Sequence, residues 1–224
     1  MNAIQYITDD NASVSHAQQA EQACAGGIRW IQFRCKSTDE DYRLQQGHAV
    51  AAVCKKYQAT FIVNDDPRLA MELDADGVHL GKADMSPKDA RILIGDTMII
   101  GATANRSEDL DASVMACINY IGVGPFRHTN TKKNLSPLLG LDGIRNVIRK
   151  WKELNFSTPV FAIGGILIDD IPALMETGIT GVAVSSAIHA AENPGLMATA
   201  FKHSIEENRR YLKEAGFQPY QKQL

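Results

Sequence analysis

The sequence is short of cysteine and has no long apolar run. Its cysteines, Cys24, Cys35, Cys54 and Cys117, form no CxxC pair, which argues against a zinc knuckle or a redox motif and predicts plain thiols. No apolar stretch approaches the roughly 20 residues of a membrane-spanning helix, and the N-terminus lacks the basic flank of a signal peptide. We therefore expect a cytoplasmic protein without a membrane partner.

A large excess of charge of either sign is also absent. The formal net charge is -3 at pH 7 and the basic residues are scattered, so the electrostatic field that nucleic acid binding requires is missing. Hydrophobic residues make up 45% of the chain and charged residues 22%, as in a globular protein with a full core. We expect small-molecule substrates and no nucleic acid partner, and the composition leaves a homo-oligomer open.

Short runs of β-branched and aromatic residues recur along the whole chain. They occupy residues 4–8, 30–34, 60–64, 77–80, 99–103, 120–124, 159–163 and 181–185. Segments with helical spacing lie between them, among them residues 39–57, 107–117, 141–154 and 169–177. This alternation predicts an α/β protein with parallel strands, and eight such units close most naturally into a (β/α)8 TIM barrel. An open doubly wound sheet is the alternative.

A chain of 224 residues has room for one large domain, so we expect a single barrel domain over residues 1–224. An amphipathic stretch runs from Asn193 to about Lys213, and residues 214–224 form a polar C-terminal tail. Helix starts are predicted at Thr38, Ser86, Ser107 and Asp169, and helix ends near Gly26 and Gly178.

The second predicted strand delivers an amide and two cations. Gln32, Arg34 and Lys36 alternate along the chain, so an extended backbone directs all three to one side. In a closed barrel the working residues lie at the carboxyl ends of the strands, and we expect this side to be the barrel mouth. The alternative is a solvated strand face, but Trp30 and Ile31 precede these residues in what should be a buried strand.

Carboxylates follow the next two strands. The third strand ends at Asn64 and Asp65, and Asp84 comes shortly after the fourth. A turn or a helix cap would use Asn64 and Asp65 equally well. Two carboxylates on neighbouring loops, opposite Arg34 and Lys36, instead favour a Mg²⁺ ion that bridges an oxyanion, because Mg²⁺ prefers hard oxygen ligands.

The later strands end in hydroxyls, glycines and a lysine. Thr129, Thr131 and Lys132 follow the sixth strand, and they can bind a diphosphate unless they form a solvated basic loop. Gly164-Gly165 and Ser185-Ser186 end the seventh and eighth strands, where barrels bind phosphate monoesters. His79 stands in the middle of the fourth strand, and a hydrogen-bonded core histidine is its favoured interpretation.

Six motifs together resemble the thiamine phosphate synthase family in order, spacing and strand position. The resemblance covers nearly the whole chain, from IQYITD to the eighth strand, and the motifs are IQFRCK, VNDDPRLA, DGVHLGKAD, GPFRHTNTK, FAIGGI and GVAVSSAI. It implies an enzyme that joins hydroxymethylpyrimidine diphosphate to thiazole phosphate, with Mg²⁺ holding the diphosphate. The implied mechanism is dissociative: the diphosphate leaves first and the thiazole nitrogen then attacks the pyrimidine cation, so no protein nucleophile is needed.

The resemblance also implies roles for individual residues. Those that match the diphosphate contacts are Arg34, Lys36, Asn64 and Lys132, and those that match the magnesium ligands are Asp65 and Asp84. Gln32 and Thr103 match positions near the pyrimidine. The residues that match the thiazole phosphate side are Thr129, Thr131, Gly165 and Ser186, and we add Ser185 beside them.

The chain departs from the family pattern in two places. Arg127-His128 stands where Phe-Pro is usual, and the fifth strand is followed by GATANR where a serine and a histidine are common. Within this motif, Asn105 stands where the related thiazole tautomerase has a histidine. Three alternatives stay open: a tautomerase, a non-catalytic paralogue that binds a thiamine precursor, and an unrelated phosphate-binding barrel. The intact set of charged residues argues against the tautomerase.

Overall fold

The computed structural model describes residues 2–128 and 137–216. Its strands are β1 (Ile4–Ile7), β2 (Trp30–Phe33), β3 (Thr60–Asn64), β4 (Gly77–Leu80), β5 (Ile99–Ala104), β6 (Tyr120–Val123), β7 (Val160–Ile163) and β8 (Gly181–Val184). All pair in parallel in chain order, and β8 pairs with β1 to close the barrel. The predicted TIM barrel is therefore confirmed, and the open sheet is excluded.

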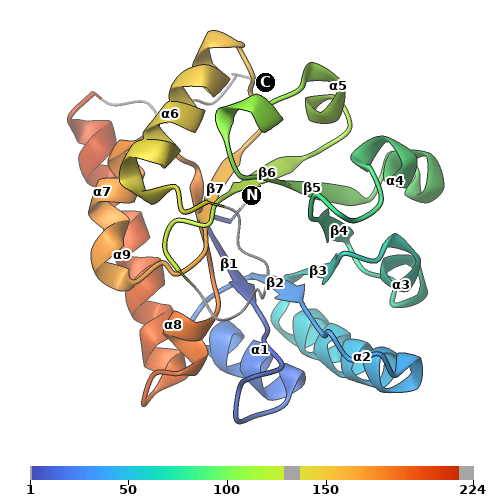
Figure 1. The fold of residues 1–224 in the computed structure, drawn as a ribbon. Coiled ribbons are helices and arrows are strands. Elements are labelled where there is room, and N and C mark those ends of the chain that lie inside the picture. The colour runs from blue at the N-terminus through green and yellow to red at the C-terminus, as the bar shows by residue number, and fades with distance from the viewer. Residues whose placement is uncertain (1, 129–136, 217–224) are drawn as a thin grey trace.

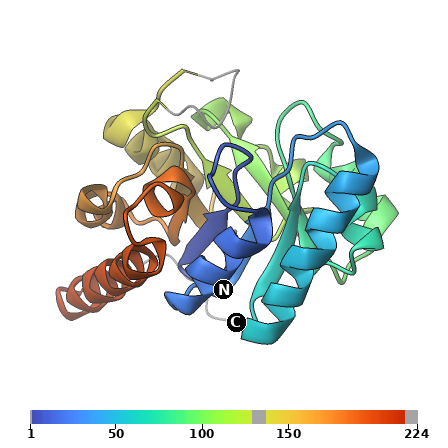
Figure 2. The same ribbon diagram turned by 90° about the horizontal axis from the view of Figure 1, so that it is seen from below.

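Helices surround the strands on the outside, as Figure 1 shows along the barrel axis. They are α1 (His16–Ala25), α2 (Glu40–Tyr57), α3 (Pro67–Glu72), α4 (Pro87–Ile94), α5 (Ala112–Met115), α6 (Gly140–Glu153), α7 (Ile171–Glu176), α8 (Ser186–His189) and α9 (Pro194–Glu214). The long helix α9 packs against α7 and α1, and it lies, in red, at the lower left of Figure 2. None of the helices in the described part of the chain combines the length and apolarity that crossing a bilayer requires.

An aromatic cluster fills the barrel at the amino ends of the strands. Trp30 packs edge to face against Tyr120 and Phe161, with ring centroids 4.8 Å apart in each case. All three side chains are almost fully buried. Edge-to-face contact places the positive ring edge on the negative ring face, which stabilises such pairs beyond the burial of their area. These rings therefore fill the interior of the barrel at the amino ends of the strands.

Several helix boundaries differ from the predictions. The single helix expected over residues 107–117 is instead a 3-10 turn, Ser107–Asp109, followed by α5, because Asp111 starts a new helix by accepting from the N–H groups of Ser113 and Val114. The helix expected over residues 169–177 likewise begins with a 3-10 turn, Ile168–Asp170, so Asp169 is not its cap. Asp39 rather than Thr38 caps α2.

Other predicted helix ends are confirmed. Ser86 caps α4, and Asn193 caps α9 by accepting from the N–H of Leu196. Gly26 ends α1, and Gly178 follows α7 in a left-handed conformation. Glu214 is still helical, so the predicted polar tail begins after it, and residues 217–224 lie outside the described part.

Candidate active site

A cavity of about 940 Å³ opens at the carboxyl ends of the strands. Its volume suits small organic ligands. The predicted site residues that line it are Gln32, Arg34, Lys36, Asn64, Asp65, Asp84, Thr103, Gly165, Ser185 and Ser186. The remaining predicted residues, Thr129, Thr131 and Lys132, lie outside the described residues.

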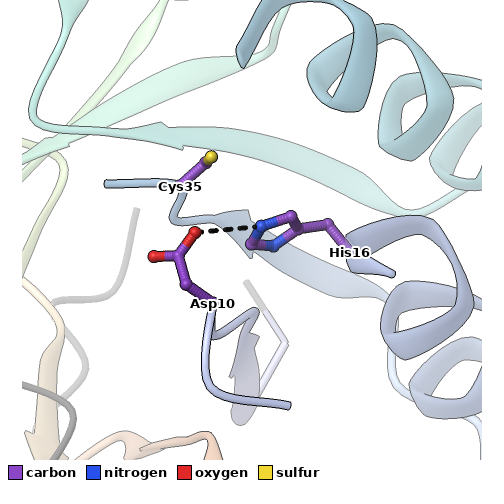
Figure 3. Close-up of side chains that lie close together, drawn as sticks. All are labelled: Asp10, His16 and Cys35. Carbon is purple, nitrogen blue, oxygen red and sulfur yellow. Dashed lines mark ion pairs between the residues drawn. The ribbon is translucent and has the colours of Figure 1, made fainter. Parts of the chain in front are cut away.

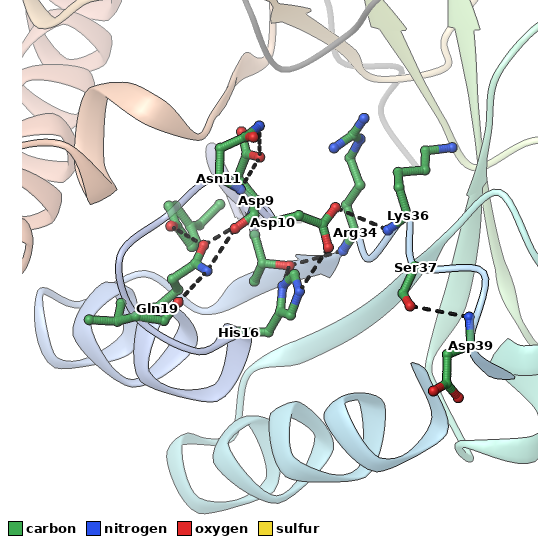
Figure 4. Close-up of polar contacts among 12 residues, drawn as sticks. Asp9, Asp10, Asn11, His16, Gln19, Arg34, Lys36, Ser37 and Asp39 are labelled. Atoms are coloured by element: carbon green, nitrogen blue, oxygen red, sulfur yellow. Dashed lines mark hydrogen bonds and ion pairs between the residues drawn. The ribbon is translucent and has the colours of Figure 1, made fainter. Parts of the chain in front are cut away.

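One side of the cavity mouth, here called the charged half, consists of Arg34, Lys36, Asp65 and Asp84. Arg34 and Lys36 directly follow β2, and in Figure 4 both side chains extend from the strand end on the side away from His16. The Arg34 side chain is largely buried, with 8% of the residue exposed, while Lys36 forms an ion pair with Asp65. Because the Arg34 side chain is held at the wall of the cavity, its guanidinium can adopt few conformations, and such a fixed cation suits the binding of an anion.

Asp65 has an unusual backbone conformation for a residue with a side chain. Its φ of 69° places it in the left-handed region, and its N–H donates to the carbonyl of His79 at 2.7 Å. The cap of α3 is the next residue, Asp66, which accepts from the N–H groups of Arg68 and Leu69. Asp65 is therefore not used as a helix cap. Strained backbone of this kind concentrates at functional sites, because the surrounding structure must maintain it.

Asp84 lies against Asp65. One carboxylate oxygen, Oδ2, accepts from the N–H of Gly81 at 2.6 Å. Burial, reinforced by the neighbouring Asp65, raises the pKa of Asp84 above its ordinary value. Two adjacent carboxylates repel each other when both are ionised, and a divalent cation with oxygen ligands relieves that repulsion. The donor set of this half therefore fits Mg²⁺.

The opposite side of the mouth, here called the glycine half, consists of Gly164, Gly165, Ser185 and Ser186. Gly164 and Gly165 both have positive φ, 95° and 67°. A Cβ atom on Gly165 would lie 2.8 Å from the carbonyl oxygen of His128, so a side chain does not fit there. This half offers backbone groups and hydroxyls but no charged side chain among its four residues.

Arg127 connects the loop after β6 to the glycine half. Its guanidinium donates to the carbonyl of Gly165 at 2.7 Å and to both carboxylate oxygens of Asp170 at 2.8 Å. Asp170 also accepts from the N–H of Leu167. The arginine that departs from the family pattern is thus an anchor between two loops of the barrel mouth.

A polar network of buried and half-buried residues contributes to the cavity wall, which His79, Gln32 and Thr103 line. His79 contacts the hydroxyl of Tyr120 through Nδ1 and that of Thr103 through Nε2, both at 3.0 Å, and the residue is 5% exposed. Gln5 donates to the Tyr120 hydroxyl and accepts from Gln32. The predicted hydrogen-bonded core histidine is confirmed. Its network also fixes two residues predicted to lie near the pyrimidine, Gln32 and Thr103.

Comparisons with known proteins agree on one family. A family model described as thiamine monophosphate synthase matches residues 4–188. The chain is 47% identical to the thiamine-phosphate synthase of Phocaeicola vulgatus, over 85% of this chain and 92% of the relative. It is 42% identical to that of Flavobacterium johnsoniae, over 92% and 98%.

The solved structures include a thiamine phosphate pyrophosphorylase from Pyrococcus furiosus with a TM-score of 0.80 and 29% identity, which covers 92% of this chain and 96% of that one. The chain belongs to the thiamine monophosphate synthase family. Membership confirms the family resemblance and the activity class that it implied, a thiamine biosynthesis transferase that releases pyrophosphate.

Sequence reasoning missed some polar residues that support the site. Gln5 and Tyr120 complete the network around His79, and their positions in β1 and β6 could have been assigned from strand alternation. Asp10 and His16 lie beside Cys35, and the possible metal-ligand atoms of these three residues are within 4.8 Å of one another (Figure 3). No spacing motif in the sequence predicts this cluster of three residues, because its members come from two loops and the start of a helix. The cysteines themselves are free, as predicted.

Proposed function

We propose that the cavity joins hydroxymethylpyrimidine diphosphate to thiazole phosphate, with the diphosphate in the charged half and the thiazole phosphate in the glycine half. The observation that carries this assignment is the contrast between the two halves. A pair of carboxylates beside a lysine suits a diphosphate bound with a metal ion. A glycine pair next to serine hydroxyls suits a phosphate monoester.

The proposed metal ligands are Asp65 and Asp84. Their mutual contact and the raised pKa of Asp84 support a site that is stabilised by a divalent cation. When bound, Mg²⁺ neutralises the charge that develops on a leaving diphosphate. The Lys36 ion pair with Asp65 brings an ammonium group to the same place.

In the proposed mechanism the bond between the pyrimidine methylene carbon and the diphosphate oxygen breaks first. The electron pair leaves with the diphosphate, and Arg34, Lys36 and Lys132 stabilise the growing negative charge. Asn64 donates a further hydrogen bond to the diphosphate. The thiazole nitrogen then forms the new bond to the methylene carbon. The chain contributes by holding both partners in line and by stabilising the leaving group.

The pyrimidine is proposed to lie deeper, against Gln32 and Thr103. The network around His79 fixes the Thr103 hydroxyl and the Gln32 amide, which supports a constant orientation of the pyrimidine ring. On the thiazole side we propose Gly165, Ser185 and Ser186 as phosphate contacts, together with Thr129 and Thr131. Arg127 supports this side by fixing the carbonyl of Gly165.

One experiment tests this proposal directly. The purified protein is incubated with both substrates and Mg²⁺, and thiamine phosphate and pyrophosphate are quantified over time. We expect the two products in equal amounts. Release of pyrophosphate without thiamine phosphate, or binding of both substrates without turnover, would instead favour the non-catalytic paralogue.

A further inference from the structure

His16 lies behind the charged half and is not among the described residues that line the cavity. It is the first residue of α1, its side chain is 4% exposed, and its ring packs edge to face on Phe33, the last residue of β2. Each ring nitrogen contacts one oxygen. Nδ1 lies 2.9 Å from Thr8 Oγ1, and Nε2 lies 3.3 Å from Asp10 Oδ1 (Figure 4).

The side chains of Thr8 and Asp10 also accept hydrogen bonds from the backbone N–H groups of Arg34 and Lys36. Thr8 Oγ1 accepts from the N–H of Arg34, and Asp10 Oδ2 accepts from the N–H of Lys36, both at 3.0 Å. Arg34 and Lys36 lie beyond the end of β2. Their backbone N–H groups are therefore bound by side-chain oxygens in place of the backbone carbonyls of a neighbouring strand. His16 therefore fixes both side chains, Thr8 and Asp10, that bind the backbone of residues 34–36.

The protonation of His16 is consistent with a supporting role. Burial lowers its pKa, against the opposing effect of Asp10, so the ring is neutral near pH 7. A neutral ring with its proton on Nε2 donates a hydrogen bond to Asp10 and, at Nδ1, accepts a hydrogen bond from the Thr8 hydroxyl. Thr8 Oγ1 then remains available to accept from Arg34. One tautomer thus satisfies all of these contacts.

A soft metal ion is the competing explanation for this cluster, since Asp10, His16 and Cys35 offer possible ligands (Figure 3). The donors are already in use, however. Both carboxylate oxygens of Asp10 and both ring nitrogens of His16 take part in the contacts above. Burial also raises the pKa of the Cys35 thiol, which keeps it protonated. The hydrogen-bonded network explains the geometry without an ion.

We propose that His16 is a positioning residue: through Thr8 and Asp10 it holds the backbone of Arg34 and Lys36 where their side chains meet the diphosphate. The identity of that ligand rests on the proposed function. Transition-state stabilisation depends steeply on placement, because a shift of about 1 Å in a binding group can lower a rate roughly 100-fold. A residue that never touches the substrate can therefore control the charged half.

The test combines kinetics with direct binding of inorganic pyrophosphate in the presence of Mg²⁺, measured by calorimetry. His16→Phe keeps the packing on Phe33 but loses both polar contacts. We expect kcat and pyrophosphate affinity to fall roughly 10- to 100-fold, with the KM for thiazole phosphate unchanged. The matched control is His203→Phe on α9, where an exposed histidine pairs with Glu207 at the same distance, 3.3 Å. The control should behave as wild type.

Two conservative variants separate the two contacts. The amide of His16→Asn lies near the place of Nδ1 and can keep the contact to Thr8, while that of His16→Gln reaches toward Asp10. Each should restore part of the lost pyrophosphate affinity. Where His16→Phe fails to fold, Thr8→Val removes the oxygen shared by His16 and Arg34 and should cause the same selective loss.

Three results would overturn the proposal. One is wild-type pyrophosphate binding in His16→Phe or, where that variant does not fold, in Thr8→Val. Another is an equal change in the KM of both substrates. The third is a stoichiometric zinc ion in the purified protein that is lost in Cys35→Ser. The pyrophosphate measurement needs no turnover, so it tests His16 even if the wild-type protein makes no thiamine phosphate.

Discussion

In our proposal, the two halves of the barrel mouth bind anions by different physical means. In the charged half, Asp65 and Asp84 lie in contact, and their repulsion is relieved by Lys36 and, in our proposal, by Mg²⁺. In the glycine half, Gly165 provides space and backbone groups in a conformation that disfavours a side chain. The first half should respond to changes of charge and metal, and the second to changes of backbone shape.

The largest effect is expected at the proposed metal ligands. Asp65→Ala or Asp84→Ala should lower kcat roughly 1000-fold, because the leaving group loses a contact to a metal ion. Steady-state rates at saturating substrates, with and without a chelator, measure this. Asp89→Ala, an exposed carboxylate in the first turn of α4, is the control and should retain full activity. Full turnover of wild type in chelator would disprove a metal role.

A smaller loss is expected for Lys132→Ala. Removing one group that stabilises developing charge should lower kcat roughly 100-fold, because the charge grows as the diphosphate departs. Separate measurement of kcat and of both KM values distinguishes the substrates. If kcat were unchanged and only thiazole affinity were lost, Lys132 would belong with the glycine half.

Gly165→Ala tests the glycine half. A left-handed conformation costs a residue with a Cβ about 1–2 kcal/mol, and the new atom would also press on His128, so the KM for thiazole phosphate should rise roughly tenfold. The KM for the pyrimidine diphosphate should not change. Gly95→Ala is the control, since Gly95 also has positive φ but has no atom within 4 Å of the added Cβ. A rise in both KM values would remove the distinction between the halves.

Arg127→Leu should have a weaker effect. The Arg127–Asp170 pair is partly exposed, and pairs of this kind contribute about 0–1 kcal/mol to the free energy of unfolding. Burial alone would raise the pKa of Asp170, but its hydrogen bonds outweigh this and lower the pKa, so the pair stabilises the fold above the usual aspartate pKa and fades in acid. Thermal unfolding should therefore separate wild type from variant by more at pH 7 than at pH 3.

No detectable tautomerase activity is expected from the wild-type chain. Asn105 lines the cavity and donates its side-chain amide to the carbonyl of Gly124, and an amide cannot exchange protons near neutral pH. The thiazole tautomer is supplied alone and its isomerisation is followed. A rate well above the uncatalysed background would show that another base, such as His128, acts on the thiazole.

The fold was largely predictable, and so was the place at the mouth of those predicted site residues that lie in the described part of the chain. Each strand ends within one residue of the predicted position, because buried parallel strands are short β-branched runs that stand out between helices. Ser107 was misassigned as a helix cap since the sequence offers two competing starts, and Asp111 makes the better one.

The supporting contacts could not be predicted in the same way. No sequence pattern links Thr8 to Arg34, which are far apart in the chain. Only the folded barrel brings the Thr8 hydroxyl to the backbone N–H of Arg34. The same holds for Gln5 and Tyr120, which meet across the barrel interior. Hydrophobic periodicity identifies which face of an element is buried, but it does not say which polar groups share that interior.

The claim that the two halves bind their anions differently can be tested by one pair of titrations. Calorimetry measures the affinities of pyrophosphate and of thiazole phosphate, each with Mg²⁺ and with a chelator, for wild type and Asp84→Ala. We predict that the loss of the metal or of Asp84 weakens pyrophosphate binding roughly 100-fold and leaves thiazole phosphate binding unchanged. Equal dependence of both ligands on Mg²⁺ and Asp84 would contradict the account.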